Sequence, residues 1–161
     1  MKMILALVTT LLFSSQLLAA GQTSALDEQA PGYYRMKLGK LRITAVSDGT
    51  VTVPLNTLLT NISAEKLRQA MASEAMTPQA ETSINAYVID DGKKRVLVDT
   101  GAGELFGSRG GHLLENLAAA GYPAESINDV LLTHVHADHS GGVSHAGKLA
   151  FPEANVYVDK R

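Results

Sequence analysis

The sequence predicts an α/β protein built in layers, and three observations lead to that fold class. Residues 33–53 form short runs in which apolar and polar residues alternate, as in antiparallel strands with one covered face. Residues 96–98 are wholly apolar, which is typical of a strand that is buried on both faces, and the apolar residues 130–132 indicate a second, short buried strand. Segments with a helical spacing of apolar residues separate the strands, so the fold combines hairpins with crossover connections.

The first strands are predicted to form an antiparallel meander. Residues 33–38 and 41–53 alternate between apolar and polar side chains. Turn signals at residues 39–40 and 48–49 divide this region, and Pro54 ends it.

A helix and a hairpin follow the meander. Ser63 can cap a helix that runs to about residue 73, with its apolar side chains on one face. Residues 83–90 and 95–99 are the next two strands, and the Asp91-Gly92 pair between them is a strong hairpin signal.

The last third of the sequence alternates helix and strand. Residues 111–120 place leucines on one helical face, and Gly121 supplies the cap at the end of this helix. Residues 130–132 form a short buried strand, and another strand begins near residue 156. The sequence stops at Arg161 almost as soon as that strand has begun, so we expect a truncated chain.

The amino terminus has the features of a cleaved signal peptide. A lysine at the second position precedes the mostly apolar residues 4–18, and small residues at 19–21 offer a cleavage site. The apolar run is too short and too polar for a spanning helix, which needs about 20 apolar residues. We expect a signal peptide at 1–21, a linker at 22–32 and a folded domain at 33–161. The protein would be periplasmic or secreted, without a stable membrane anchor.

Composition limits both the partners and the metal ligands. The formal net charge is −2 at pH 7, and acidic and basic residues are interspersed along the chain. Nothing in that order suggests a nucleic-acid stripe or a polybasic membrane patch, so the expected partner is a small molecule. The chain has no cysteine, which excludes a thiolate metal site and a cysteine nucleophile. Any metal ion must therefore be bound by histidine and carboxylate side chains.

Four metal-binding side chains lie within six positions directly after the predicted strand at 130–132. They are His134, His136, Asp138 and His139. Because residues two apart in extended chain point the same way, His134 and His136 can reach one ion. The chain must bend at Asp138 and His139, which can face a second ion. Imidazole and carboxylate ligands favour zinc, iron or manganese over calcium or magnesium.

Two less specific interpretations of this cluster are a solvated histidine-rich loop and a histidine pH sensor. Neither explains why the cluster directly follows a buried strand, which is where α/β proteins place ligands. Gly141-Gly142 then permits backbone conformations that bulkier residues resist, which would help the loop to fold around the ions. We therefore favour metal binding.

One segment, THVHADHSGG at residues 133–142, resembles the histidine motif of the metallo-β-lactamase superfamily, His-x-His-x-Asp-His. Residues 97–101, with the sequence LVDTG, are similar to the strand-end motif that precedes it in that family, at a typical separation. Residues 30–35, 47–50 and 118–123 also resemble the methyl parathion hydrolase branch. The likeness extends from about residue 30 to the end of the chain.

The resemblance implies an αββα sandwich with a two-metal site, here truncated to its N-terminal half. His134 and His136 would bind the first ion, and Asp138 and His139 the second. Asp99 would steady the histidine loop without binding a metal, and a carboxylate that only caps the strand-end turn is the alternative. The family pattern also contains two more histidines and a bridging carboxylate, which we expect beyond the last residue of this sequence.

The resemblance also implies the chemistry, a metal-dependent hydrolase with two divalent ions, usually zinc. A metal-bound hydroxide would attack an ester, lactone or phosphotriester, and Asp138 would act as the catalytic carboxylate that orients it. A periplasmic metallo-β-lactamase acting on β-lactams and an inactive metal-binding fragment are the alternatives. His112 and His145 are expected to be surface histidines. The oligomeric state stays open, with a homodimer among the options.

Overall fold

The structure is a computed structural model that describes residues 30–160. The expected signal peptide at 1–21 and most of the expected linker at 22–32 lie outside the described residues. Among the residues that are described, no helix is both long enough and apolar enough to span a membrane.

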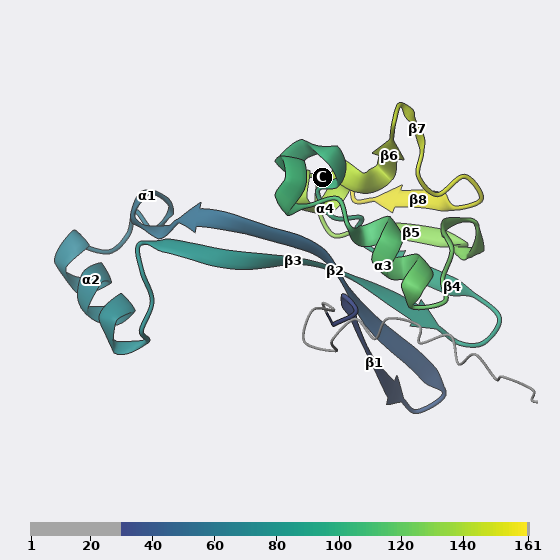
Figure 1. Ribbon diagram of the computed structural model, residues 1–161, viewed down its shortest axis with the longest axis horizontal. Helices are drawn as coiled ribbons and strands as arrows, with labels where there is room; N and C mark the ends of the chain where they lie inside the picture. The colour runs from purple at the N-terminus through teal and green to yellow at the C-terminus, as the bar shows by residue number, and fades with distance from the viewer. Residues whose placement is uncertain (1–29, 161) are drawn as a thin grey trace, which may run out of the picture. The chain divides into compact units, whose positions relative to one another are not determined.

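Six strands form one mixed sheet in the order β1-β2-β3-β4-β5-β8 (Figure 1). They are β1 (Tyr33–Leu38), β2 (Leu41–Pro54), β3 (Gln79–Asp90), β4 (Arg95–Val98), β5 (Asp129–Leu132) and β8 (Asn155–Val158). Strands β1 to β4 pair antiparallel, whereas β4, β5 and β8 pair parallel. The predicted α/β pattern of a meander followed by crossovers is thus confirmed. A separate two-stranded sheet pairs β6 (Ser144–His145) with β7 (Lys148–Leu149).

Strand β2 is continuous where the sequence predicted a turn at residues 48–49. Its register against β3 shifts between Ser47 and Gly49, so Asp48 lies in a β-bulge rather than in a turn. Gly49 has a φ of 142°, and a Cβ there would lie 2.0 Å from the carbonyl oxygen of Arg109. The Asp-Gly pair signals both turns and bulges, and the long partner strand β3 selects the bulge here. Strand β3 accordingly begins at Gln79, earlier than predicted.

Short helices connect these strands. Helices α1 (Leu55–Leu58) and α2 (Ala64–Ser73) join β2 to β3. The predicted cap of α2 is confirmed, because the Ser63 hydroxyl accepts a hydrogen bond from the Lys66 N–H at 3.4 Å. Helix α3 (Leu113–Ala119) follows the 3-10 helix η1 (Gly103–Arg109), and α4 (Ala137–Ser140) follows β5.

The core lies on one face of the sheet, beneath α3. Leu113 and Leu117 of α3 are buried there in one cluster with side chains of four strands. Those strand residues are Val46, Ala86, Val88, Leu97 and Val130. On the opposite face Tyr87, Leu131 and Tyr157 stay 40–51% exposed. The prediction that the strand at 96–98 is buried on both faces is met only in part, because Leu97 is buried whereas Val96 and Val98 are half-buried. The strand at 130–132, predicted to be buried, is buried at Val130 but exposed at Leu131.

Candidate metal centre

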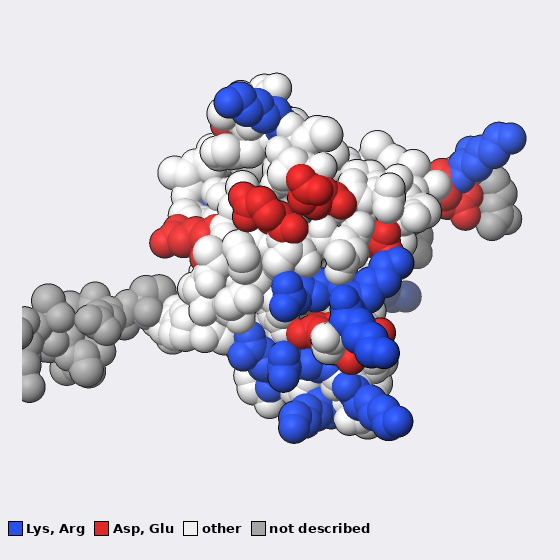
Figure 2. Space-filling model, turned by 90° about the vertical axis from the view of Figure 1, so that its right-hand side faces the viewer, with Lys and Arg blue, Asp and Glu red and all other residues white. Residues whose placement is uncertain are grey.

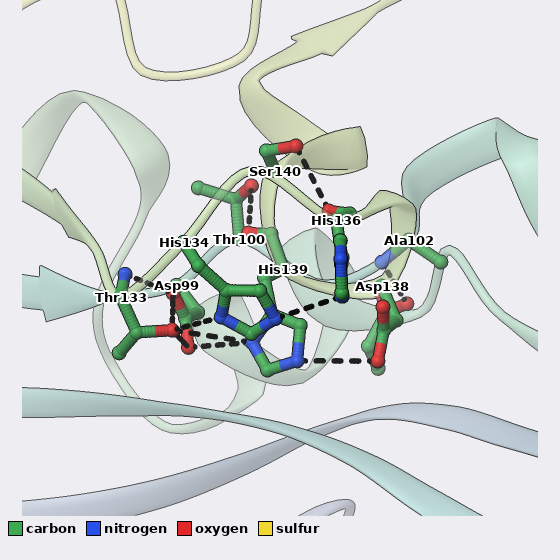
Figure 3. A network of polar contacts seen from close by, with 10 residues as sticks. Asp99, Thr100, Ala102, Thr133, His134, His136, Asp138, His139 and Ser140 are labelled. Atoms are coloured by element: carbon green, nitrogen blue, oxygen red, sulfur yellow. Dashed lines mark hydrogen bonds and ion pairs between the residues drawn. The ribbon is translucent and has the colours of Figure 1, made fainter. Parts of the chain in front are cut away.

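The candidate site lies at the edge of the sheet where two neighbouring parallel strands end. Asp99 directly follows β4, and the segment 133–139 directly follows β5. Because β4 and β5 run parallel, both segments emerge at the same edge. Figure 3 shows the imidazoles of His134, His136 and His139 gathered there with the carboxylates of Asp99 and Asp138.

His134 and His136 form the first donor pair. The Nε2 atom of His134 lies 3.1 Å from the Nδ1 atom of His136, and the two rings meet edge to face. Zn–N bonds are about 2.0–2.1 Å long, so two nitrogens of one tetrahedral zinc ion lie roughly 3.3 Å apart. The observed separation is close to that value. The prediction that both imidazoles reach one point is consistent with this geometry.

Asp138 and His139 form the second donor pair. The Nε2 atom of His139 lies 3.2 Å from the Oδ2 atom of Asp138, which again suits two ligands of one ion. The rings of His134 and His139 have centroids 4.0 Å apart, so the two pairs adjoin. Helix α4 begins one residue after His136, and this turn of the chain produces the bend that the sequence predicted.

The donors fit transition metals by chemistry, and each pair provides part of a coordination shell. Imidazole nitrogens and carboxylate oxygens are the ligands that zinc accepts. Within residues 30–160, however, no three histidine or acidic side chains converge on one point. Each pair would supply two of the four ligands that tetrahedral zinc takes, and the others would have to come from elsewhere.

Asp99 holds the loop at residues 133–139 in place through contacts on the side away from the candidate metal ligand atoms. Its carboxylate accepts hydrogen bonds from the Thr133 backbone N–H at 2.8 Å and from the Thr133 hydroxyl at 2.9 and 3.0 Å. It also lies 2.8 Å from the Nδ1 atom of His139. Asp99 is only 6% exposed, so water competes little for these contacts. These contacts agree with the steadying role that the resemblance implied. A carboxylate that only capped the strand-end turn would not also contact His139.

We assign the hydrogens of two rings from these contacts. Because the Asp99 carboxylate accepts, we assign the hydrogen of His139 to Nδ1, which leaves the Nε2 lone pair facing Asp138. The Thr133 hydroxyl has a single hydrogen, which we assign to its bond with the Asp99 carboxylate. The Nδ1 atom of His134, 3.0 Å from that hydroxyl oxygen, is therefore also a donor. Both rings present a bare Nε2, the form in which histidine binds metals.

Close backbone packing holds the same loop in place. The Thr100 N–H and hydroxyl both donate to the His139 carbonyl oxygen, at 2.8 and 2.9 Å. A Cβ on Gly142 would lie 2.0 Å from the Thr100 carbonyl oxygen, and one on Gly141 would lie 2.3 Å from that of Ala102. The sequence suggested that these glycines serve unusual backbone angles. Gly141 instead has an ordinary helical φ of −64°, so glycine is needed there because a larger residue would not fit.

Sequence reasoning missed Asp48 as a supporting residue. Its side chain is fully buried, and its carboxylate accepts the N–H groups of Ala102 at 2.8 Å and Leu113 at 3.1 Å. It thereby ties the bulge in β2 to the loop after β4 and to the start of α3. The Ser47-Asp48-Gly49-Thr50 likeness was the only signal for it, because these partners lie 54 and 65 residues away in the sequence.

The two remaining described histidines lie outside the cluster. His112 is 51% exposed and lies 3.8 Å from a carboxylate oxygen of Glu115. His145, in β6, is 57% exposed and lies 3.7 Å from a carboxylate oxygen of Glu104. Both are surface residues, as the sequence predicted.

The sequence model of the metallo-beta-lactamase superfamily matches residues 80–151, which contain both strand ends and all four candidate metal ligands. Over this stretch, a little under half of the chain, the sequence is similar to that superfamily. The match begins within β3 and includes β4 and β5, so the superfamily segment coincides with the part of the sheet that carries the donors.

Two curated relatives are similar to a shorter part of the chain, and that part is a small share of their own length. An atrochrysone carboxyl ACP thioesterase of Aspergillus fumigatus is 42% identical over 69 residues, which are 43% of this chain and 20% of the relative. The lactamase-like protein adaB of Aspergillus niger is 46% identical over 59 residues, 37% of this chain and 17% of the relative.

Two solved structures are similar over most of the described chain. One, hydrolase AbOPH in the beta lactamase superfamily, is 38% identical with a TM-score of 0.77 over 83% of this chain. The other, the dizinc quorum-quenching lactonase AidC, is 31% identical with a TM-score of 0.76 over 80% of this chain. The match spans 46% and 45% of those two proteins. The fold is thus that of these superfamily hydrolases, of which the chain corresponds to a little under half.

Proposed function

We propose that the whole protein is a metal-dependent hydrolase that cleaves an ester, lactone or phosphotriester. The two adjoining donor pairs carry this proposal, because they are spaced as ligands of two neighbouring ions. A dizinc lactonase and a hydrolase of the same superfamily share this part of the fold, and both are more than 30% identical to it. The thioesterase relatives also act on an acyl bond by their names, so a thioester belongs among the substrates to test.

His134 and His136 would hold one ion, and Asp138 and His139 the other. Divalent ions of this kind, when bound, lower the pKa of a water molecule to about 7 and withdraw charge from a carbonyl or phosphoryl oxygen. Asp99 and Thr133 keep the Nε2 lone pairs of His134 and His139 available by holding hydrogens on Nδ1. The Asp138 carboxylate accepts a hydrogen bond from the attacking water and thereby orients it toward the substrate.

The test uses the whole protein that contains this chain. We expect purified protein to contain a transition metal, and a chelator to abolish its turnover of paraoxon, a simple lactone, a thioester or nitrocefin. His134→Ala and Asp138→Ala should each leave less than about a tenth of the wild-type activity, because single supports of metal sites already cost about 10–100-fold. His145→Ala is the matched control, since it removes an exposed histidine outside the cluster and should keep full activity.

Three results would contradict the proposal or redirect it. Turnover that survives the chelator, in protein without bound metal, would refute metal-dependent hydrolysis. Activity restricted to nitrocefin would identify the β-lactamase alternative. Zinc binding without turnover of any substrate would favour the inactive metal-binding fragment, to which the two-donor geometry also corresponds.

We also propose that the protein is exported to the periplasm or secreted, on the strength of the amino-terminal sequence. The mature form should then begin between about residues 20 and 25. N-terminal sequencing of the exported protein checks this, and an intact Met1 on the purified product would rule it out.

A further inference from the structure

Six cationic side chains gather at one end of the sheet, and we call this surface the basic end. It consists of Lys37, Lys40, Arg42, Lys93, Lys94 and Arg95. The strand register brings them together, since Lys37 faces Arg42 across β1 and β2. Asp90 of β3 in turn faces Arg42 on one side and Arg95 of β4 on the other. Figure 2 shows this group of Lys and Arg side chains in the lower part of the face it draws.

Positive charge is in excess at the basic end. Three carboxylates lie among its six cations, and two of them make ion pairs, Asp90 with Arg42 at 3.2 Å and Asp129 with Lys94. The third, Asp91, accepts the backbone N–H groups of Lys93 and Lys94 at 2.8 and 2.7 Å.

Three lysines of the basic end are left for an external partner. Lys37, Lys40 and Lys93 are exposed, and none of the carboxylates within residues 30–160 lies in ion-pair distance of their ammonium groups. A hollow of about 310 Å³ lies between the two hairpin turns, and Lys37, Lys40 and Arg42 line it together with Asp90 and Asp91. Such a surface attracts anions, and its excess charge raises their local concentration.

An exposed apolar side chain at the basic end favours a membrane over nucleic acid as the anionic partner. Leu38 lies between Lys37 and the turn that carries Lys40, and it is 62% exposed. Met36, on the same side of β1, is 49% exposed. Leu38 points to the other face of β1 from Lys37, but both lie at the same end of the strand. An apolar side chain at an end that also carries lysines suits a membrane interface, where it enters the headgroup region while the cations stay beside the phosphates. Single-stranded nucleic acid fits less well, because no aromatic side chain of the described chain lines the hollow for a base to stack on.

We propose that the basic end docks on a lipid bilayer with anionic headgroups. Lys37, Lys40 and Lys93 contact the phosphates, and Leu38 enters the interface. The metal-binding loop follows the carboxyl end of β5, whereas Lys94 and Arg95 lie at the amino end of β4, which runs parallel to β5. Docking therefore leaves the candidate metal centre on the side away from the lipid.

The experiment measures cosedimentation of the whole protein with vesicles. Phosphatidylcholine vesicles are compared with vesicles that also contain phosphatidylglycerol, at low and at high salt. Each lysine near an anionic surface contributes roughly fivefold in affinity, so the variant K37Q/K40Q/K93Q should bind the anionic vesicles on the order of a hundredfold more weakly. The variant K66Q/R68Q/K148Q removes the same number of exposed positive charges elsewhere and should bind like the wild type.

Every outcome decides the proposal, and none depends on whether the protein hydrolyses anything. Residues 1–30 are the same in all variants, so any binding by that segment cancels in the comparison. A selective, salt-sensitive loss in K37Q/K40Q/K93Q supports docking, and a smaller loss in Leu38→Ser supports entry of the leucine. Equal binding to both vesicle types, or equal loss in both triple variants, overturns the proposal. Binding to a DNA duplex but not to anionic vesicles would overturn it in favour of nucleic acid.

Discussion

Replacing Asp48 by asparagine tests whether a buried carboxylate supports the loop of candidate metal ligands from a distance. The carboxylate accepts two backbone N–H groups, from Ala102 and Leu113, in a fully buried place. Asparagine keeps one acceptor oxygen and turns an NH2 group toward the other N–H, which is left unpaired. A buried donor without a partner costs about 1–3 kcal/mol, so Asp48→Asn should lower the free energy of unfolding by roughly 2 kcal/mol.

The assay is urea unfolding followed by circular dichroism, combined with competition for zinc against a chromophoric chelator. We expect weaker zinc binding as well, because the loop that Asp48 holds contains Gly101, whose carbonyl oxygen accepts the Gly142 N–H at 3.2 Å. Asp91→Asn is the matched control. Its carboxylate also accepts two backbone N–H groups, but in an exposed turn where water can replace it. Equal losses of stability in the two variants would refute the reasoning.

Two further predictions concern the space around the loop and the acid stability of the sheet. Gly142→Ala should cost about 1–3 kcal/mol and weaken zinc binding, because its Cβ would lie 2.0 Å from the Thr100 carbonyl oxygen. Gly39→Ala strains a turn that has open space around it, so this variant should bind zinc as the wild type does. An equal loss of zinc binding in Gly142→Ala and Gly39→Ala would count against the packing argument. The hydrogen bond from Lys94 lowers the pKa of Asp129. The ionised Asp129 therefore stabilises the fold above the pKa of about 4 that aspartate has in the unfolded chain, and this stabilisation is lost as the pH falls below that value. Between pH 5 and pH 3 the free energy of unfolding, measured with urea, should decrease less for Asp129→Asn than for the wild type. An identical decrease in the two proteins would argue against this contribution.

The donor pairs could be predicted from sequence because they depend on local geometry. His134 and His136 leave a strand in extended chain, and their spacing alone places them on one side. The strand before them and the glycines after them were also recognisable. What the sequence did not show is why those glycines are needed, since the contact with Thr100 forms only when two segments about 40 residues apart pack together.

Features that depend on register or on distant contacts escaped sequence reasoning. The Asp48-Gly49 pair signals a turn or a bulge equally well, and only the length of the facing strand β3 decides between them. The cations of the basic end are interspersed with other residues along the chain, and strand pairing alone gathers them. Local patterns therefore predict the elements and the candidate donors, whereas the pairing of strands determines the supporting contacts and the surface charge.

The backbone of Asp99 has a consequence for protein engineering. Asp99 has a φ of 61°, in the left-handed region that aspartate and asparagine tolerate better than other residues with a side chain. Glutamate would keep the charge, but it fits this backbone poorly and would reach one methylene too far. A library designed to change the substrate range should therefore keep residue 99 as aspartate.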